Sequence, residues 1–408
     1  MRRSYGSLPE CLQLSYDDSA MFSQRTNWPL TPNRFTVSLE EARRSGTQII
    51  DLTVSNPTRA GLAYDEAAIL DPLCNRKVLD YDPQPKGLRV ARETIAGYYA
   101  ERGHNISPEF LFLTTGTSEA YSFVFRLLAN PGDEILVAKP SYPLFDFLAD
   151  LQDVNLVPYC LLYDHGWQID FHTLKRAINE RTRAIVLVHP NNPTGSFVKE
   201  NEREHLNEIC ARHNLALVVD EVFLDYSHDG VPRHSFVSND SALTFTLSGL
   251  SKISALPQMK LAWIVVSGPI EQVRLALERL EVIADTYLSV SAPVQWAAQT
   301  LLEQRRTIQP QLATRISGNL AELDRQLAEQ KFCSCLIVEG GWYAVLRVPA
   351  TRSDEDLATD LLRERQVLVH PGHFYDFPSD GYIVLSLIAT PEEFFAGISG
   401  LMEFFEHL

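Results

Sequence analysis

Lys252 is the residue whose setting most strongly suggests chemistry. It ends the segment 247–252 (LSGLSK), in which small residues follow an apolar run typical of a strand. A lysine near the end of a buried sheet loses its proton more readily, because burial disfavours the charged form. The neutral amine can then attack a carbonyl carbon and form a Schiff base. Taken alone, the segment is better explained by an ordinary surface lysine, since most lysines are exposed.

Two further segments place polar side chains directly after apolar runs. The run 215–219 ends at Asp220, and the segment 188–195 (VHPNNPTG) closes another run with a rigid turn that carries Asn192. Ligands of α/β proteins bind where the carboxyl ends of the parallel strands meet. We therefore expect Asp220 and Asn192 to lie near Lys252, although a helix cap or a proline-glycine turn explains each segment on its own.

A strand-to-helix turn and an aromatic residue complete the set. The run 110–114 leads into Thr115-Gly116-Thr117-Ser118 and then into a helical pattern over 117–129. The free amides of such a helix N-terminus can hold a phosphate, or the turn is a simple cap. In the segment 140–143 (PSYP), Tyr142 follows a strand and could stack on a planar ligand or merely pack.

The elements that must position these residues follow an alternating pattern. Seven short apolar runs alternate with helix-length segments, which predicts an α/β fold: a three-layer, mostly parallel sheet with helices on both faces. The runs are 110–114, 135–138, 156–162, 184–189, 215–219, 243–247 and 261–267. A helical pattern over 270–286 follows the last run.

The pattern changes after about residue 290, which predicts a second, smaller α+β domain. Its expected helices are 293–328, 353–365 and 391–407, and its expected strands are 342–348 and 382–388. We expect four parts along the chain: an N-terminal arm (1–20), a segment joining the small domain (21–57), the large domain (58–290) and the small domain (291–408).

Composition limits the possible partners. The 408 residues carry a formal net charge of −16, which argues against binding nucleic acid or an anionic membrane through a broad basic surface. The six cysteines have no metal-ligand spacing, and we expect reduced thiols, no metal site and a cytoplasmic location. No apolar run reaches the roughly 18 residues that a membrane helix needs.

Taken together and in this order, these segments resemble the class I/II aminotransferases, which are pyridoxal-phosphate (PLP) enzymes of fold type I. The resemblance spans nearly the whole chain from about Met21. It includes Tyr81 with the downstream Gly87-Leu88-Arg89, and the segment 51–57 (DLTVSNP) near the family's N-terminal substrate loop.

The resemblance implies an aminotransferase that moves an amino group between an amino acid and a 2-oxo acid. Lys252 would form the internal aldimine with PLP and move the proton at the substrate α-carbon, and Asp220 would pair with the pyridinium nitrogen. The resemblance also implies a homodimer with shared sites. The remaining implied contacts are Asn192 with the ring's phenolic oxygen and the substrate, Tyr142 with the ring face, Gly116, Thr117, Ser118 and Lys260 with the phosphate, and Tyr81 with the phosphate of the partner subunit's site. Where the chain departs from the family, we expect Ser248 and Ser251 as hydroxyl donors and Asn56 as a substrate contact.

Four positions depart from the family pattern. Phe223 stands where the family has a tyrosine that donates to the phenolic oxygen, and we do not expect Tyr226 to replace it. Gly249 replaces a serine, and Lys260 replaces an arginine, which keeps the charge but loses the bidentate fork.

The fourth departure is Val384, at the place of the arginine that binds the substrate carboxylate. Either another donor substitutes or the substrate lacks that carboxylate, and the candidate donors are Arg347, Arg59 and His373. We expect the segments 340–343 and 370–375 to line the substrate pocket or to belong to the core of the small domain.

The departures leave a second reaction open on the same fold. A PLP-dependent lyase, acting by β-elimination at a C–S bond or by other carbanion chemistry, would release ammonia without a 2-oxo acid acceptor. A ligand sensor fused to a DNA-binding module is a third possibility. Such a module would need about a hundred basic residues before the domain, whereas only about 20 residues precede the patterned stretch, in an acidic chain.

Overall fold

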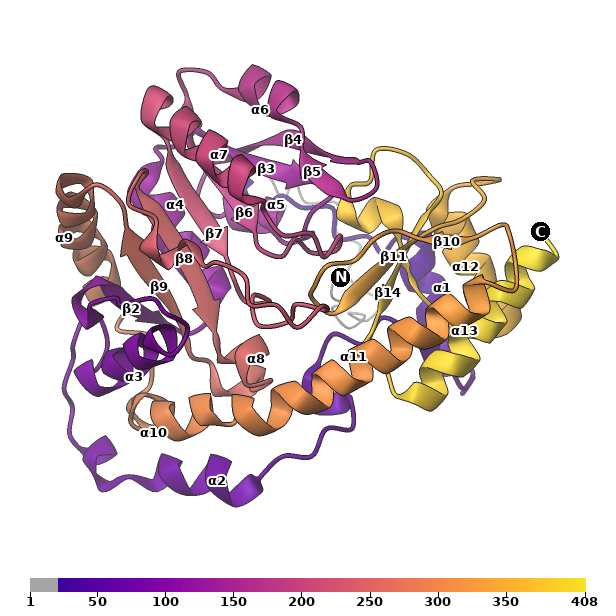
Figure 1. Ribbon diagram of the computed structural model, residues 1–408, viewed down its shortest axis with the longest axis horizontal. Helices are drawn as coiled ribbons and strands as arrows, with labels where there is room; N and C mark the ends of the chain where they lie inside the picture. Colours follow the sequence, from indigo (N-terminus) through magenta and orange to yellow (C-terminus); the bar gives the residue numbers. More distant parts are fainter. Residues whose placement is uncertain (1–20) are drawn as a thin grey trace.

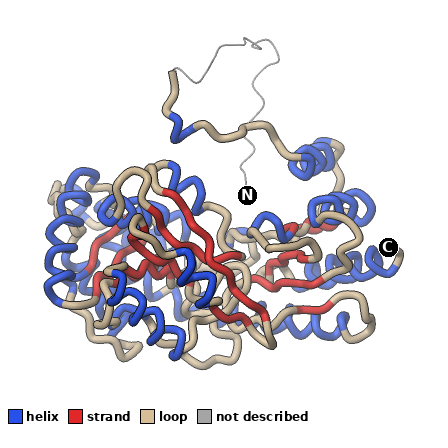
Figure 2. Tube along the Cα trace, turned by 90° about the horizontal axis from the view of Figure 1, so that it is seen from above, coloured by secondary structure: helices blue, strands red, loops and turns tan. Residues whose placement is uncertain are grey.

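Two β-sheets organise the molecule, a large one and a small one (Figure 1). The structure is a computed structural model that describes residues 21–408, so the arm predicted for residues 1–20 lies outside the described residues. Seen along the other axis in Figure 2, the strands form two separate groups, and helices flank both.

The large sheet has eight strands and is mostly parallel. Of its described strands, β9 and β5 run opposite to the other six, which share one direction. This confirms the predicted α/β class. In order across the sheet the strands are β2 (Leu111–Thr114), β9 (Ala262–Ser267), β8 (Thr244–Gly249), β7 (Ala216–Asp220), β6 (Thr182–Val188), β3 (Glu134–Lys139), β4 (Asn155–Tyr163) and β5 (Trp167–Ile169).

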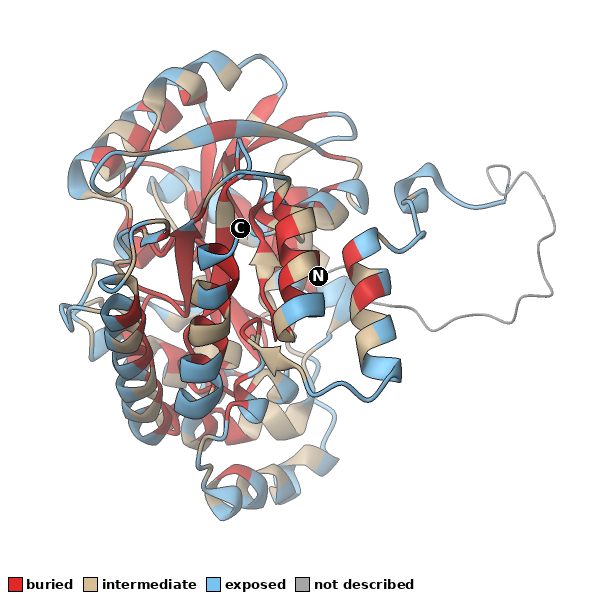
Figure 3. Ribbon diagram, turned by 90° about the vertical axis from the view of Figure 1, so that its right-hand side faces the viewer, coloured by how far each residue is buried: buried red, intermediate tan, exposed pale blue. Residues whose placement is uncertain are grey.

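Both faces of the large sheet are buried, which explains why its strands are continuous apolar runs. Along β7, Ala216 and Val218 pack into one core, while Leu217 and Val219 pack into the core on the opposite face. Figure 3 shows the resulting pattern, with buried strands inside and helices exposed on their outer faces.

Helices cover the large sheet on both sides. The first core takes apolar residues from α4 (Thr117–Leu128), α5 (Phe145–Asp150) and α9 (Ile270–Tyr287). The opposite core takes them from α6 (Phe171–Ala177) and α7 (Glu200–His213). A third core, below β2 and β9, is built by α3 (Arg89–Ala100), α8 (Leu250–Ile253) and α10 (Ala292–Glu303), with a residue of α2 (Glu66–Leu70).

The small sheet is antiparallel and has the strand order β10-β11-β14-β13. Its strands are β10 (Ser334–Cys335), β11 (Tyr343–Arg347), β14 (Tyr382–Ser386) and β13 (His370–Pro371). The helices around it are α1 (Arg34–Arg44), α11 (Arg305–Leu327), α12 (Asp354–Arg365) and α13 (Pro391–Glu406).

The N-terminal segment packs with the small sheet's helices. Helix α1 contacts α12, and β1 (Ile50–Asp51) pairs in parallel with β12 (Val367–Leu368). The backbone N–H of Ser386 then donates to the carbonyl oxygen of Leu52 at 2.7 Å. The segment after β1 therefore runs along the end of β14 and into the space between the two sheets.

Short 3-10 helices fill several connections. They are Gln24–Thr26, Pro57–Arg59, Asp71–Cys74, Arg76–Leu79, Pro108–Phe110, Phe236–Ser238, Pro257–Met259 and Gly372–Tyr375.

The single helix predicted over 293–328 is wrong, because the chain forms α10 and α11 with a break at Gln304. The break follows from the carbonyl oxygen of Leu302, which accepts hydrogen bonds from the Arg305 guanidinium at 3.1 Å and the Ser254 hydroxyl at 3.3 Å. A continuous helix would use that oxygen for a backbone N–H. Buried Arg305 also forms ion pairs with Glu303 and Glu101.

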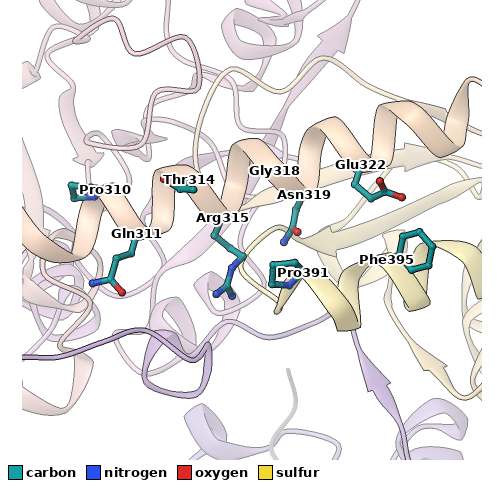
Figure 4. Close-up of a pocket in the computed structure, with 9 residues that line it drawn as sticks. All are labelled: Pro310, Gln311, Thr314, Arg315, Gly318, Asn319, Glu322, Pro391 and Phe395. Atoms are coloured by element: carbon teal, nitrogen blue, oxygen red, sulfur yellow. The ribbon is translucent and has the colours of Figure 1, made fainter.

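A groove of about 700 Å³ lies along α11 and α13 (Figure 4). Two of its polar side chains are engaged with backbone: Arg315 donates to the carbonyl oxygens of Ala60, Ile388 and Ala389, and Asn319 donates to those of Leu387 and Ala389. These bonds tie α11 to the turn between β14 and α13, so both groups serve the packing of the small unit.

Candidate active site

The residues singled out in the sequence come together at one edge of the large sheet. Asp220 is the last residue of β7, Lys252 follows β8 in α8, and the turn with Asn192 follows β6. Gly116 follows β2, and Tyr142 follows β3. Because these five strands run in the same direction, their carboxyl ends lie at the same edge.

Asp220 is buried and held by two donors. Its Oδ1 accepts from the backbone N–H of Val222 at 3.0 Å, and its Oδ2 accepts from the Tyr121 hydroxyl at 3.2 Å. Burial raises the pKa of Asp220 to about 6, while the two hydrogen bonds and the charge of Lys252 oppose that shift. The site therefore holds one carboxylate that gains from a cationic partner.

The Lys252 amine lies between aromatic rings. Its Nζ is 4.5 Å from the ring centroid of Trp342 and 5.2 Å from that of Phe223, and it donates to the carbonyl oxygen of Ser55 at 3.4 Å. Burial lowers the pKa of Lys252 to about 8, and the charge of Asp220 limits the fall. Most of this amine is still protonated at pH 7, but its neutral, nucleophilic form is far more populated than in an ordinary lysine.

The two asparagines of the 188–195 turn have different surroundings. Asn191 donates through Nδ2 to the carbonyl oxygen of Pro140 at 3.2 Å and to the Thr194 hydroxyl at 2.9 Å, so it stabilises the turn. Asn192 is buried, and neither Oδ1 nor Nδ2 of its amide has a hydrogen-bond partner within the described chain, whereas Asn191 lacks a partner only at Oδ1. A buried amide without partners costs free energy unless a ligand pairs with it.

The start of α4 forms an anion cradle. Gly116 at its N-cap is extended, and no side chain caps the amides of the first turn. Thr115 instead bonds Glu119 through its N–H and its hydroxyl. A Cβ on Gly116 would lie 3.3 Å from Nζ of Lys260, so a cation faces this bare N-terminus. Free amides beside an ammonium suit a phosphate.

The hydroxyls beside Lys252 are open to a ligand. Ser248 is buried at the end of β8, and Ser251 is partly buried in α8. Neither hydroxyl has a hydrogen-bond partner among residues 21–408. Tyr142 lies near enough to Asp220 for that charge to affect its pKa. Burial and then the charge of Asp220 raise the pKa of Tyr142 to about 12, although 39% of the residue's surface is exposed.

These groups fit PLP, which has an aldehyde carbon, a pyridine nitrogen, a phenolic oxygen and a phosphate. A nucleophilic amine, a buried carboxylate, an unpaired amide and an anion cradle match the four in chemical type. The match rests on the orphaned Asn192 and the bare helix N-terminus, as well as on the residue types.

Two predicted site residues lie apart from this cluster. Tyr81 is 84% exposed and borders a groove of about 560 Å³ formed with residues 284–296. Asn56 caps the 3-10 helix Pro57–Arg59, because its Oδ1 accepts from the N–H and the hydroxyl of Thr58. Its neighbour Ser55, which the sequence did not single out, contacts Lys252 instead.

Two of the four departures have clear structural outcomes. The hydroxyl of Tyr226 donates to the carbonyl oxygen of Lys252 at 2.6 Å, so it does not replace the hydroxyl missing at Phe223. Val384 is fully buried in β14.

Among the described residues, none of the three candidate substitutes for the missing arginine forms a hydrogen bond or ion pair with Lys252 or Asp220. Arg347 instead lies over the Tyr382 ring and bonds its hydroxyl at 3.3 Å. His373 is exposed, as is Arg59.

The aromatic wall over Lys252 comes from the segment 340–343, which was expected either to line the pocket or to belong to the core. Trp342 is fully buried yet faces the amine, and its Nε1 has no partner in the described chain. Tyr343 bonds Ser55 through its side chain. Tyr121, the partner of Asp220, was missed, although it lies one helical turn beyond the predicted cradle on the same helix.

Comparisons with known proteins agree with this geometry. Residues 49–392 match the family described as aminotransferase class I and II. The glutamate-pyruvate aminotransferase AlaA of Escherichia coli K12 is 29% identical over 353 residues, which cover 83% of this chain and 87% of the relative. The alanine aminotransferase of Mycobacterium tuberculosis H37Rv is 26% identical over 376 residues, covering 88% and 86%.

Solved structures share the fold. An aminotransferase from Escherichia coli superposes with a TM-score of 0.80 at 26% identity, covering 93% of this chain and 99% of that one. The alanine aminotransferase of Pyrococcus furiosus gives a TM-score of 0.82 at 21% identity, covering 91% and 96%. The matched family and these relatives are transaminases, which supports transamination over the elimination considered as its alternative.

Proposed function

The chain belongs to the class I and II aminotransferases, and from that premise we propose which residues carry its reaction and which amino acids it uses. Its activity is PLP-dependent transfer of an amino group between an amino acid and a 2-oxo acid. PLP supplies an aldehyde that accepts the amino group and an electron-poor ring that stabilises negative charge on the substrate α-carbon.

Lys252 is the acid and base of the reaction. With PLP present, its amine would hold the cofactor's aldehyde carbon at rest and, once free, would move the proton at the substrate α-carbon. The observation that supports this role best is the setting of the Lys252 amine, which lies 4.5 Å from the ring centroid of Trp342 and whose pKa is lowered by burial to about 8. A base with a pKa close to the working pH transfers protons efficiently in both directions.

The remaining residues hold the cofactor. Asp220 pairs with the pyridine nitrogen and keeps it protonated, because a buried carboxylate gains from a cationic partner. Asn192 donates to the phenolic oxygen, and Tyr142 covers the ring. The phosphate is bound by Gly116, Thr117, Ser118 and Lys260, with Ser248 and Ser251 as hydroxyl donors.

The substrate is an amino acid with an uncharged side chain. The groups around the Lys252 amine are the rings of Phe223 and Trp342 together with a backbone carbonyl, and none of them favours a second anion. Alanine is the first substrate to test, because relatives over most of the chain are named for reactions of alanine.

An absorbance screen tests the reaction and the roles together. Purified protein with bound PLP should change its absorption on addition of L-alanine and should regain it with pyruvate, without release of ammonia. Borohydride should fix the cofactor to wild type but not to Lys252→Ala. Release of ammonia without a 2-oxo acid acceptor would overturn the proposed function, and retained attachment in the variant would overturn the role of Lys252.

The protein acts as a homodimer in the cytoplasm, with Tyr81 reaching the partner's phosphate. Leu79 and Tyr81 are exposed on one segment, and five cysteines are free thiols, which suits a reducing compartment. None of the described helices is long and apolar enough to cross a membrane. Residues 58–290 form the PLP-binding domain, and residues 291–408 with 21–57 form the domain that covers the substrate.

A further inference from the structure

The face of the small sheet that carries Tyr343 also carries the position of the missing arginine. In β11, Tyr343 and Val345 are two residues apart and point to the same side. Val345 lies opposite Val384 in β14, and Val384 lies opposite His370 in β13. Residues directly opposite each other share a face. Val345, Val384 and His370 therefore form one row, adjacent to Tyr343.

This face is turned toward the Lys252 site. Tyr343 contacts Ser55, whose carbonyl oxygen accepts from Lys252, and its ring lies 6.3 Å from that of Phe223. Arg347 lies one row beyond Val345, away from Tyr343, with its guanidinium over Tyr382. Among the described residues, the row next to Tyr343 thus holds no arginine or lysine, and its one polar side chain is that of His370.

His370 is paired with a tyrosine that reaches back toward the site. Its Nδ1 lies 2.9 Å from the Tyr375 hydroxyl. The carbonyl oxygen of Tyr375 accepts from the N–H of Ser141, next to Tyr142. Burial, followed by the nearby hydroxyls of Tyr343 and Tyr142, raises the pKa of Tyr375 well above its ordinary value. The Tyr375 hydroxyl therefore bonds His370 and lies near enough to Tyr343 and Tyr142 for their hydroxyls to affect its pKa.

We propose that the hydroxyl of Tyr375, positioned by His370, binds the carboxylate of the amino acid substrate in place of the arginine that is absent at Val384. This rests on the proposed function. When Nδ1–H of His370 donates to the phenolic oxygen, the hydroxyl hydrogen of Tyr375 is free to donate to a carboxylate oxygen. The subsite is neutral, because burial lowers the pKa of His370 to about 3.

A neutral donor recognises a carboxylate less strongly than a bidentate arginine does. It nevertheless distinguishes an amino acid from the same amine without the carboxylate. Loss of a hydrogen bond to a charged group costs about 1.5–3 kcal/mol, which corresponds to about 10–100-fold in kcat/KM. That selectivity is the signature to measure.

The experiment compares two pairs of probes on the PLP-loaded enzyme: L-alanine with ethylamine, and L-phenylalanine with 2-phenylethylamine. Tyr375→Phe should lower kcat/KM for the amino acids by about tenfold or more and leave the amines unchanged. His370→Gln should act in the same direction. Tyr382→Phe is the matched control, because it removes a hydroxyl from the same sheet at the exposed end beside Arg347 and should change neither.

Two further measurements separate recognition from folding. The inhibition constant of propionate should rise in Tyr375→Phe and stay constant in Tyr382→Phe. Adding Val384→Arg to Tyr375→Phe should restore selectivity for the amino acids. A purely structural Tyr375 would instead lower the rates with amino acids and amines together and would not be rescued.

The outcomes separate the two proposals. If wild type transaminates amino acids and Tyr375→Phe keeps full selectivity, the carboxylate subsite is wrong and the proposed function stands. If wild type accepts the amines as well as the amino acids, the chain has no carboxylate recognition and the subsite is again wrong. If wild type reacts with none of the four probes and with no other amino acid, the proposed function fails and the subsite with it.

Discussion

Lys252 is subject to opposing influences, of which burial is the largest, so its pKa falls well below that of an ordinary lysine. Burial disfavours the ammonium, whereas the charge of Asp220 and the faces of Trp342 and Phe223 favour it. The net result is a pKa of about 8. The amine is therefore ready to react near neutral pH, and its reactivity depends on pH.

The pH dependence can be measured on apoprotein. Because only the neutral amine attacks an aldehyde, the rate of covalent PLP uptake should rise as the pH increases through about 8 and then level off. Asp220→Asn removes an anion that raises the pKa of Lys252, so its profile should shift to lower pH. Stopped-flow absorbance between pH 6.5 and 9.5 checks both, and a rate that falls with rising pH would contradict the assignment.

Lys260 should matter for affinity and not for attachment. Lys260→Ala removes the cation that faces Gly116, and loss of a charged hydrogen bond of about 1.5–3 kcal/mol should weaken PLP binding about 10–100-fold. Lys260→Arg should bind nearly as well as wild type. Lys331→Ala, on an exposed lysine, is the control. Equal dissociation constants for all four proteins would remove Lys260 from the phosphate site.

The site residues that could be predicted from sequence share one property. Lys252, Asp220 and Asn192 each follow an apolar run directly, so strand order places them at one edge. Ser55 and Trp342 reach the same amine from segments about 200 residues before it and 90 residues after it. Their proximity depends on how the small sheet packs, which no local pattern records.

At the scale of elements, the turn after β6 is fixed by its contact with the small unit. Gly195 has φ +69°, and a Cβ there would lie 2.5 Å from the carbonyl oxygen of Gly340. Gly340 is itself enclosed by the Phe197 ring and the carbonyl oxygen of Tyr226. The turn that carries Asn192 is therefore in backbone contact with the segment that carries Trp342 and leads into β11.

Gly195→Ala should destabilise the protein more than the same change at an open glycine. Gly103 is the matched control, since its φ is +83° and no atom lies within 4 Å of a Cβ there. Gly103→Ala should cost about 1 kcal/mol from backbone strain alone, and Gly195→Ala should cost at least about 2 kcal/mol more because a backbone atom must move. Urea unfolding measures the difference, and equal costs would refute the backbone contact.

Glu221, at the end of β7, should make stability depend on pH. It is buried, and burial raises its pKa from 4.5 to about 7, against the hydrogen bonds from Phe236 and Ser235. Between these values the folded state holds a proton that the unfolded state has released. Stability from this group is therefore greatest below about pH 4.5 and is lost as the pH rises to about 7.

The test compares wild type with Glu221→Gln, whose amide cannot titrate. The difference in free energy of unfolding should move in favour of the variant by up to about 3 kcal/mol between pH 4.5 and 7. Denaturant melts at several pH values measure it. A difference that is constant with pH would show that Glu221 keeps an ordinary pKa in the folded protein.

The elements found from sequence were the long ones. Period and composition located the strands of the large sheet to within one or two residues, except β5. Burial on both faces makes these strands continuous apolar runs, apart from β4, which is largely exposed or partly buried. The missed strands β1, β5, β10, β12 and β13 have two or three residues each and no pattern of their own. The break at Gln304 was missed because it depends on Arg305 and Ser254 reaching one carbonyl oxygen.

At the scale of the whole molecule, Tyr81 forms no hydrogen bond or ring contact within the described chain. It lies near Leu79 beside the groove formed with residues 284–296, and the two side chains are 84% and 82% exposed. Large apolar side chains that gather on one exposed surface mark an interface. The proposed homodimer would cover this surface and give Tyr81 a phosphate to reach.

Leu79→Glu should therefore convert a dimer into monomers and reduce PLP affinity at the same time. Val231→Glu, at another exposed apolar residue, is the control and should leave both unchanged. Sedimentation velocity measures the mass, and PLP titration measures the affinity. A wild-type protein that sediments as a monomer with full activity would rule out shared sites.

Trp342 also provides an intrinsic fluorescence signal from the active site. Its indole ring centroid lies 4.5 Å from Nζ of Lys252, the proposed attachment point of PLP, far closer than the range over which an excited indole transfers energy to an absorbing neighbour. Tryptophan emission should fall as the cofactor enters and partly recover as it becomes the amine form, and the change should shrink in Trp342→Phe. Each half of the catalytic cycle could then be timed by fluorescence, with no dye and no coupled enzyme.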